Sequence, residues 1–582
     1  PVYTAKRNDI ENLNASIYMK INLPLGFSIQ TTYSPRFEWT NYLYQKSADH
    51  PSAGSQNGRA ERKQTKDFYW QWDNMLKWNK VFGKHSFDFT FLANWEKFQR
   101  WQDEMTNEDF QPTDDLGYGG IGFGTTPKIE SNDIYRTGDA YMGRLHYVYD
   151  QRYLITATVR RDGYSAFGLA NPRATFPAVA LGWVFSEEKW LNMPEWFEYG
   201  KLRLSWGKNG NRAVDTYAAF MQLSPRKYLY VDPATGKLIT INTFYAMTMA
   251  NPNLKWESTV SWNAGLDFTL LKGRLNGSLD VYKKITKDLL VSRELPNLIG
   301  YSTVMSNIGE VQNHGVELSL NSTNIKMKNL TWRTSFSFAY NKNKITHLYG
   351  IMEDIKDEAG NVIGQKEADD IKNKRFIGHD IDEIWDYKVV GIWQEEDREE
   401  AAKYGQQPGD VHLLDVDGNG SYTNEDKVFQ GTKTPRFRWN MRNEFTLFKN
   451  LTFSFSMYSY LGHKQTLGRF TNDNALLNVT NQIKREYWTP ENRNNEYPRL
   501  ASKKPSGVTY AIYKNASFLR FDNISLGYSF PKRLIEPLKI QALNINATMK
   551  NAGYISNWPG YDPENSDKNT PRIIYFGINL TL

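Results

Sequence analysis

Apolar and polar residues alternate along the chain over many separate stretches. In the clearest one, residues 260–270, apolar side chains occupy every second position from Val260 to Leu270, and Ser, Asn, Gly, Asp and Thr lie between them. A period of two places these sets on opposite faces of a β-strand. After residues 271–274 the alternation restarts with Leu275, Gly277, Leu279 and Val281. Two such stretches around a tight link predict a β-hairpin.

The same alternation recurs in roughly seventeen stretches, many of about 9–14 residues, which is longer than the usual soluble strand of about 5–6. Further apolar rows lie in residues 87–95, 332–340, 437–447, 451–457 and 574–582. Strands of this length suit a tilted crossing of a bilayer. A large soluble β-sandwich or propeller is the alternative, but we would expect shorter strands there, with more Lys and Glu on their polar faces. We therefore predict an all-β fold, a transmembrane antiparallel β-barrel.

Short and long links between these stretches largely alternate. The short links are Leu25-Gly26, Val81–His85, Asp150-Gln151, Leu271–Arg274, Phe448–Asn450 and Pro531–Pro537. The long polar stretches are 34–67, 99–136, 208–255, 286–310, 343–434, 461–514 and 551–571. Outer-membrane barrels have tight periplasmic turns and long external loops. If the last strand ends at the periplasm, every short link falls on the periplasmic side.

The composition narrows the function classes. Over 582 residues the net charge is only +7, so a nucleic-acid partner is not supported. No run of about 18 apolar residues predicts a transmembrane helix, and the mean hydropathy is -0.63. There is no Cys, which excludes disulfides, thiolate metal sites and cysteine nucleophiles. Trp, Tyr and Phe make up 14% of the chain, as expected of a structure with one apolar and one wet face.

Sequence signals of an enzyme are poor. The 8 His residues form no His-Glu-x-x-His pair, and neither a Gly-x-Ser-x-Gly elbow nor a Walker loop occurs. Acidic pairs such as Glu395-Glu396 are typical of solvated loops. We therefore expect no catalytic residues and no organic cofactor.

Several segments, in order from about residue 75 to the last residue, match one known sequence pattern. They are Tyr149–Thr156, Val159–Gly168, Phe176–Trp183, Leu202–Asn211, Asn251–Glu257, Asn307–Glu317 and Pro408–Asp410 with Asp415–Asp426. In these segments the sequence resembles the SusC/RagA family of TonB-dependent transporters of the Bacteroidetes outer membrane.

The resemblance implies a 22-stranded barrel with an internal plug that imports nutrients, either oligosaccharides or oligopeptides. It implies a SusD-like surface lipoprotein as the lid, energy from the TonB complex acting on the plug, contact with membrane lipid and lipopolysaccharide, and a two-barrel assembly. The plug and about five first strands of the family are absent here, so we expect residues 1–582 to be an incomplete barrel. An odd count of strands, against the usual even number, agrees with this expectation. The alternative is a structural or assembly subunit of a larger outer-membrane complex.

A possible Ca²⁺ loop lies within the long external loop 343–434. Residues 415–426 have oxygen side chains at positions 1, 3 and 5, Gly at position 6 and a carboxylate at position 12, as in calcium loops. Position 12 is Asp rather than Glu, and no flanking helix pair is evident. An Asx-rich turn without metal is the alternative. The predicted ligands are Asp415, Asp417, Asn419, Ser421 and Asp426, in a structural role.

Two further groups of residues are candidates for contact. Exposed loop aromatics can stack on sugar rings or bind peptide side chains, although a membrane-interface girdle, loop packing or partner contact would also account for them. They are Trp385, Tyr387, Trp393, Tyr487, Trp488 and Trp558. The inward polar faces, with Asn263, Asp267, Arg438, Arg442 and Glu444, are predicted to dock the plug and form interior salt bridges rather than to bind substrate.

Overall fold

The computed structural model describes residues 4–50, 57–110, 115–357, 359–466, 486–500, 502–565 and 568–582. Parts of five expected long loops, including 467–485, lie outside these ranges. Among the described residues, nineteen strands form one antiparallel sheet, so the predicted all-β class is confirmed. The chain divides into two compact units. None of the helices in the described part is long and apolar enough to cross a membrane.

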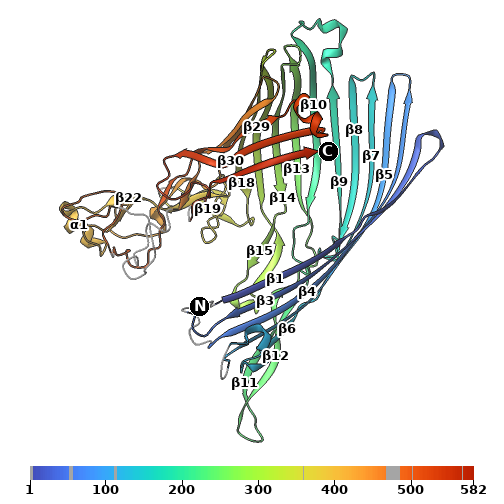
Figure 1. Ribbon diagram of the computed structural model, residues 1–582. Helices are drawn as coiled ribbons and strands as arrows, with labels where there is room; N and C mark the ends of the chain where they lie inside the picture. The colour runs from blue at the N-terminus through green and yellow to red at the C-terminus, as the bar shows by residue number, and fades with distance from the viewer. Residues whose placement is uncertain are drawn as a thin grey trace. The chain divides into compact units, whose positions relative to one another are not determined.

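Unit 1 comprises residues 1–183, 204–262 and 285–310. Its long strands follow one another as hairpins, drawn in blue to green in Figure 1. Its strands are β1 (Thr4–Asn14), β2 (Ile17–Asn22), β3 (Phe27–Lys46), β4 (Arg59–Phe82), β5 (His85–Glu108), β6 (Lys128–Ser131), β7 (Ile134–Tyr149), β8 (Tyr153–Tyr164), β9 (Arg173–Trp183), β11 (Gln222–Val231), β12 (Leu238–Met249), β15 (Leu290–Glu294) and β16 (Thr303–Asn307). Its 3₁₀ turns are η1 (Pro24–Gly26), η3 (Gly117–Phe123) and η6 (Asn297–Ile299).

Three strands of unit 1 extend far beyond their predicted ends. β3 has 20 residues, and β4 and β5 have 24 each, so much of 34–67 and 99–136 is strand rather than loop. Cross-strand ion pairs hold these outer parts together: Arg59 lies 3.1 Å from Glu108, and Lys63 lies 3.3 Å from Glu104. Strands outside a bilayer need no apolar face, so the alternation that predicts a strand is lost there.

The stretch 208–255 also contains strands that were not predicted. β11 and β12 pair over their length, from Leu223 opposite Ala246 to Val231 opposite Leu238. The resulting hairpin projects from unit 1 at the bottom of Figure 1. Among the described residues, strand pairing to the rest of unit 1 occurs at its base, where β12 pairs in parallel with β16 at Thr248 and Met249.

Unit 2 comprises residues 184–203, 263–284 and 311–582. β10 (Phe197–Asn211), β13 (Glu257–Leu270) and β14 (Leu275–Lys287) each contribute residues to both units. The strands of unit 2 are β17 (Glu310–Lys326), β18 (Leu330–His347), β19 (Met352–Lys356), β20 (Val362–Glu367), β21 (Glu383–Tyr387), β22 (Val389–Ile392), β23 (Val411–Leu413), β24 (Lys427–Thr432), β25 (Phe437–Leu447), β26 (Leu451–Leu461), β27 (Lys464–Thr466), β28 (Tyr513–Asn515), β29 (Phe518–Ser529), β30 (Ala542–Ser556) and β31 (Ile573–Thr581). Its helices are α1 (Arg398–Lys403) and α2 (Lys532–Ile535), with 3₁₀ turns η4 (Phe185–Glu187), η5 (Lys189–Leu191), η7 (Glu395–Asp397), η8 (Asn424–Asp426) and η11 (Glu536–Leu538).

The predicted tight turns join the predicted strands. β13 and β14 are separated by residues 271–274, and β25 and β26 by 448–450. These turns use left-handed backbone, with φ of 59° at Leu271 and 69° at Lys449, which such short links require. The long connections lie between these hairpins, as expected, although the β8–β9 link is short.

The number of strands in the large sheet agrees with the seventeen estimated from the sequence if β1 and β2 are counted as one strand and the short β6 is not counted. β1 and β2 pair with successive parts of the same strand, β3, and are interrupted only at Ala15 and Ser16. β6 has only four residues and pairs with the outer part of β5. If β1 and β2 are taken as one strand and β6 is left aside, seventeen long strands remain among the described residues.

Candidate functional site

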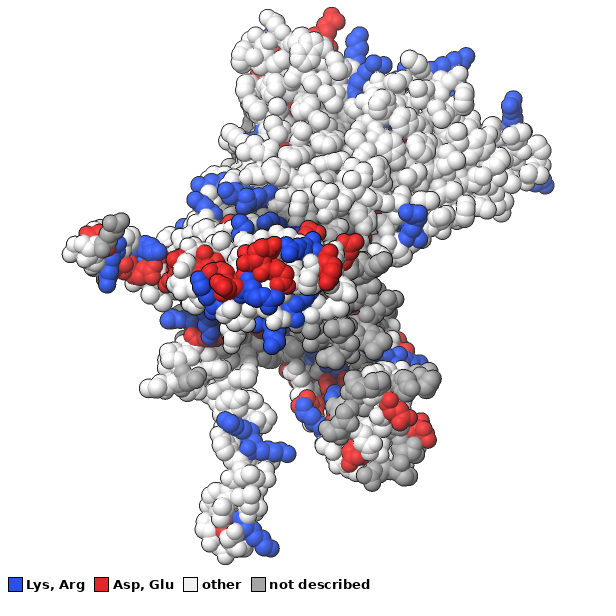
Figure 2. Space-filling model, turned by 90° about the vertical axis from the view of Figure 1, so that its left-hand side faces the viewer, with Lys and Arg blue, Asp and Glu red and all other residues white. Residues whose placement is uncertain are grey.

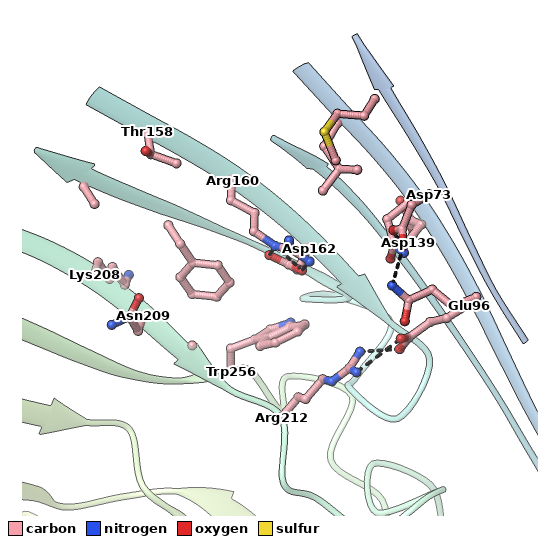
Figure 3. A pocket seen from close by; sticks show the side chains of 17 residues that line it. Asp73, Glu96, Asp139, Thr158, Arg160, Asp162, Lys208, Asn209, Arg212 and Trp256 are labelled. Carbon is pink, nitrogen blue, oxygen red and sulfur yellow. Dashed lines mark hydrogen bonds and ion pairs between the residues drawn. The ribbon is translucent and has the colours of Figure 1, made fainter. Parts of the chain in front are cut away.

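A cavity of about 810 Å³ lies against one face of the sheet in unit 1. Alternate residues of neighbouring strands form its wall, because side chains at every second position share a face. Asp73 of β4 lies directly opposite Asn94 of β5, and Gln71 lies opposite Glu96. β8 adds Thr158, Arg160 and Asp162, and the end of β10 and the segment after it add Lys208, Asn209 and Arg212 (Figure 3).

Most charged groups of this cavity have a partner. Asn94 Nδ2 donates to Asp73 at 2.7 Å, and Arg160 Nε donates to both carboxylate oxygens of Asp162 at 2.9 Å. Arg212 forms an ion pair with Glu96 (Figure 3). Lys208 forms no ion pair with any residue in the described ranges. The wall therefore offers one unpaired cation beside fixed carboxylates, side-chain amides and the hydroxyl of Thr158.

Segments that carry the family resemblance meet at one side of this cavity. Phe167 stacks on Trp256 with ring centroids 4.7 Å apart. Gly168 N donates to Leu254 O at 3.0 Å, and a Cβ at Gly168 would lie 2.1 Å from Pro252 O, so only glycine allows this approach. The segments Val159–Gly168 and Asn251–Glu257 thus form one packed wall.

Trp256 is 6% exposed and lines the cavity. Its indole Nε1 is buried without a hydrogen-bond partner among the described residues. Buried polar groups normally have a partner. The Asn307 side chain holds the neighbouring backbone from outside, with hydrogen bonds to Lys255 N and O of 2.8 and 2.6 Å. Paired charges, side-chain amides, one hydroxyl, a free cation and an indole suit the binding of a polar ligand.

In unit 2, the long loop between β18 and β25 packs against residues of the connection between β26 and β29 around one small core. Tyr387, Ile392, Val411, Leu413, Trp488 and Val508 form this core. Trp393 stacks on His412 at 3.5 Å, and its Nε1 donates to Gln406 at 3.0 Å. Trp488 Nε1 donates to Gln394 at 3.0 Å. Burial lowers the pKa of His412, so this imidazole is neutral at neutral pH.

The Pro408-Gly409-Asp410 motif joins the two parts of this loop structure. Asp410 is fully buried and lies 2.9 Å from Arg499 Nε, and it also accepts from Lys503 N at 3.0 Å. Gly409 has φ of 90° and donates its N–H to Trp393 O at 2.7 Å. The motif therefore fixes residues 486–500 and 502–517 onto the loop between β18 and β25.

The calcium-like loop brings its carboxylates together. One oxygen each from Asp415, Asp417 and Asp426 lie within 4.8 Å of one another. Asp426 is fully buried and accepts from Val416 N at 2.8 Å and Thr423 N at 2.7 Å. Asn419 Oδ1 accepts from Ser421 N and Oγ. Burial raises the pKa of Asp415, but hydrogen bonds from Tyr404 and from the backbone outweigh it and lower the pKa to about 2.

Comparisons with known proteins identify the family. The profile described as "TonB dependent receptor-like, beta-barrel" matches residues 2–552. This chain belongs to the TonB-dependent receptor β-barrel family. The family consists of outer-membrane proteins, so the predicted bacterial outer-membrane location is confirmed.

Two curated relatives, both TonB-dependent receptors, match most of this chain. The chain is 32% identical to TonB-dependent receptor SusC of Bacteroides thetaiotaomicron over 480 residues, which cover 78% of this chain and 45% of that protein. It is 29% identical to TonB-dependent receptor P3 of Formosa agariphila over 506 residues, which cover 85% of this chain and 49% of that protein. The chain thus spans about half the length of the relatives it matches.

A solved structure shares the fold. The chain superposes on the RagAB peptide transporter with a TM-score of 0.80 at 20% identity, covering 99% of this chain and 62% of that chain. The suspected resemblance to SusC/RagA-like TonB-dependent receptors is therefore confirmed. Its curated relatives are TonB-dependent receptors, and none of those compared is described as an enzyme.

The predicted ligand-binding aromatics are not all exposed. Tyr387, Trp393, Trp488 and Trp558 are between 3% and 6% exposed, so the expectation of exposure is wrong for these four. Loop packing, the alternative, accounts for their burial. Trp385 is half-buried between Phe376 and Lys427, and Tyr487 is 39% exposed. Ligand contact by these six residues stays a prediction.

The inward polar residues of unit 2 form the predicted interior ion pairs. Arg203 donates to Asp267 at 2.8 Å and to Asp280 at 2.9 Å, and Asn263 donates to Asp280 at 2.8 Å. Arg442 pairs with Glu444 at 3.2 Å. Arg438 lines a second cavity of about 530 Å³ with Tyr458 and Tyr460.

Sequence reasoning missed the cavity in unit 1. Asp73, Glu96, Asp162 and Lys208 were not among the candidate residues, because each looks like an ordinary polar position on an alternating strand. The available signal was the cluster of family segments, whose residues Phe167, Phe176 and Trp256 pack together.

Proposed function

We propose that this chain forms the barrel wall of an outer-membrane transporter that imports oligosaccharides or oligopeptides. Uptake is energised through TonB, and a SusD-like surface lipoprotein holds the ligand at the external mouth. Two barrels with two such lids form the assembly. Family membership supports the TonB dependence. Similarity to SusC and to the RagAB peptide transporter supports the nutrient class and the partner.

The cavity in unit 1 is the observation that carries this proposal. At about 810 Å³ it has room for an oligosaccharide or a short peptide. Hydroxyl and amide groups of either ligand would find acceptors at Asp73 and Asp162, a cation at Lys208 and the face or N–H of Trp256. Because every side chain of this wall sits on a hydrogen-bonded strand or a packed loop, little ordering is needed on binding.

The β11–β12 hairpin supports a protein partner. Both of its faces are apolar and exposed: Leu229 is 69% and Phe244 72% exposed on one face, and Tyr228 is 49% exposed on the other. Figure 2 shows this hairpin as the slender projection at the lower edge, mostly uncharged with a few Lys and Arg. An isolated two-stranded hairpin is only marginally stable, and exposed apolar surface of this kind marks an interaction site. The hairpin belongs to a long connection, on the side where the lipoprotein would sit.

We also propose that residues 415–426 bind Ca²⁺ in a structural role. Close carboxylates, the oxygen of Asn419 and the Gly at position 6 fit a hard cation. Asp415, Asp417, Asn419 and Asp426 would hold it, with an oxygen at Ser421. The ion would tie the loop to η8, which Asp426 already caps.

Ligand binding by variants of the cavity tests the function. The full-length transporter is purified with any co-purifying protein, and binding of defined oligosaccharides and oligopeptides is measured by calorimetry. We expect Asp162→Asn with Lys208→Gln to weaken binding about a hundredfold or more, since each lost contact to a charged group is worth about 1.5–3 kcal/mol and every 1.4 kcal/mol is about tenfold. Lys255→Gln is the matched control, because its ion pair with Asp288 lies outside the cavity lining. Unchanged binding in the double variant would contradict the proposal, and binding of neither class would favour the assembly-subunit alternative.

A further inference from the structure

Four tight turns of unit 2 form a continuous rim at one end of its strands. They are the β13–β14 turn (271–274), the β17–β18 turn (327–329), the β25–β26 turn (448–450) and the β29–β30 connection (530–541). Hydrogen bonds join neighbouring turns of the rim or the strand ends beside them. Thr323 N donates to Arg274 O at 2.7 Å, and Phe448 N donates to Asn329 O at 2.9 Å. Asn450 Nδ2 donates to Ser529 O at 2.7 Å.

Each turn of this rim presents an apolar side chain to solvent. Leu271 is 51%, Met327 68%, Phe448 68%, Leu534 54% and Leu538 68% exposed. Lone exposed apolar residues need no explanation, but here one or more recur in each of four adjacent turns.

The same turns carry cations beside these apolar residues. They are Lys272, Arg274, Lys326, Lys328, Lys449, Lys532, Arg533 and Lys539, all of them exposed. None of these eight forms an ion pair with a residue in the described part of the chain. The only acidic residue within the four connections is Glu536. Acidic groups of unit 2 at this end otherwise lie on residues 184–203, where Glu187, Glu188, Glu195 and Glu198 precede or begin β10.

We propose that this basic rim binds the phosphate headgroups of anionic phospholipids in the periplasm-facing leaflet of the outer membrane. Cations near a membrane surface attract anionic lipid by about 1 kcal/mol each, which is about fivefold in affinity. The neighbouring apolar side chains would enter the boundary between headgroups and acyl chains. A protein partner would instead need a packed apolar surface, and the rim has single apolar residues separated by charges.

This inference rests on the orientation within the proposed function, in which tight turns face the periplasm. Phospholipid and lipopolysaccharide both carry phosphate groups. The proposed ligand is phospholipid, because lipopolysaccharide occupies the opposite leaflet. The attraction acts between solvent-exposed charges, so added salt weakens the binding of lipid. At 1 M salt the screening length is only about 3 Å.

The test compares lipid retention by the full-length protein and its variants. The protein is reconstituted in nanodiscs with phosphatidylethanolamine in excess over phosphatidylglycerol, and lipids retained after extraction are counted by mass spectrometry. Lys326→Gln, Lys328→Gln, Lys449→Gln, Lys532→Gln and Arg533→Gln are combined in one variant. A second variant changes the four lysines to arginine. The control is Lys227→Gln with Lys237→Gln on the β11–β12 hairpin, two exposed cations outside the rim.

We expect the native protein to enrich phosphatidylglycerol about fivefold or more, and the Gln variant to lose this enrichment. The Arg variant and the hairpin control should keep it, and 1 M salt should reduce it. Equal retention by the native protein and the Gln variant would overturn the proposal. Displacement of the lipid by millimolar inorganic phosphate would also overturn it, since the rim would then be a site for free phosphate.

A separate measurement distinguishes a wrong orientation from a wrong lipid preference. The sequence has no Cys, so Lys449→Cys gives a unique label in this region. We expect a membrane-impermeant maleimide to label it only after the outer membrane is permeabilised. Labelling in intact cells would place the rim outside and overturn the periplasmic site, and with it the orientation in the proposed function.

Discussion

At the scale of single residues, a buried ion pair fixes the last long connection. Arg520 of β29 is 3% exposed in its side chain, and its Nη2 lies 2.6 Å from Asp562. Glu564 lies 2.7 Å from Nε, and Tyr458 donates to Glu564 at 2.6 Å. Thr570 donates to the other oxygen of Asp562. The Arg520 guanidinium of β29 and the Tyr458 hydroxyl of β26 thus tie the connection between β30 and β31 to two strands.

Removing this guanidinium should release the connection. Arg520→Met leaves Asp562 buried without its counter-charge, which costs about 3 kcal/mol or more. We expect faster hydrogen exchange over residues 557–565 and 568–572, measured by mass spectrometry, with little change in β25 and β26. Lys403→Gln is the control, because its pair with Glu400 is exposed and worth less than about 1 kcal/mol. Unchanged exchange in Arg520→Met would contradict the anchoring role.

At the scale of elements, the molecule combines regular hairpins with long connections that have their own structure. The turn of 448–450 is held by hydrogen bonds to both neighbouring turns. The connection between β18 and β25, with Trp393, instead shares a buried core with the connection between β26 and β29, which contributes Trp488. A strand can be recognised by local alternation, whereas such a core depends on residues about 90 positions apart.

The calcium-like loop is such an element, and terbium tests it. Tb³⁺ uses the same oxygen ligands as Ca²⁺ and luminesces when a nearby Tyr absorbs light; Tyr404 donates to Asp415 at 2.8 Å. We expect Tb³⁺ emission that Ca²⁺ displaces, and its loss in Asp415→Asn with Asp417→Asn. Asp357→Asn is the control, because Asp357 accepts from Ala359 N at 3.0 Å in a similar Asx turn outside the motif. No emission from the native protein would favour the metal-free Asx-rich turn.

The projecting hairpin is a second element whose role can be tested. We expect Leu229→Asp with Phe244→Asp to abolish co-purification of the surface lipoprotein in mild detergent, because a buried carboxylate in an apolar contact is costly. Lys237→Asn near the tip of the hairpin should leave it intact. Retention of the lipoprotein by the double variant would show that the hairpin is not the docking surface.

At the scale of the whole molecule, the sequence predicts the framework better than the site. Alternation such as Val260–Leu270 identifies membrane strands, because one face must be apolar. It fails for the outer parts of β4 and β5, where Lys63 and Glu104 pair across strands that need no apolar face. The cavity depends on register and on a contact between Phe167 and Trp256, which local pattern cannot supply. The segments that resemble the family could be recognised in the sequence, but the sequence did not predict that they pack against one another.

Energised uptake tests the central claim most directly. A fluorescent form of the ligand that binds the purified transporter is given to cells of the native organism, and intracellular accumulation is measured. The comparison is between native cells, cells without this protein, cells without the lipoprotein and cells without TonB. The account predicts accumulation in native cells, and loss of it when this protein, the lipoprotein or TonB is removed. Equal accumulation in all four strains would contradict the account.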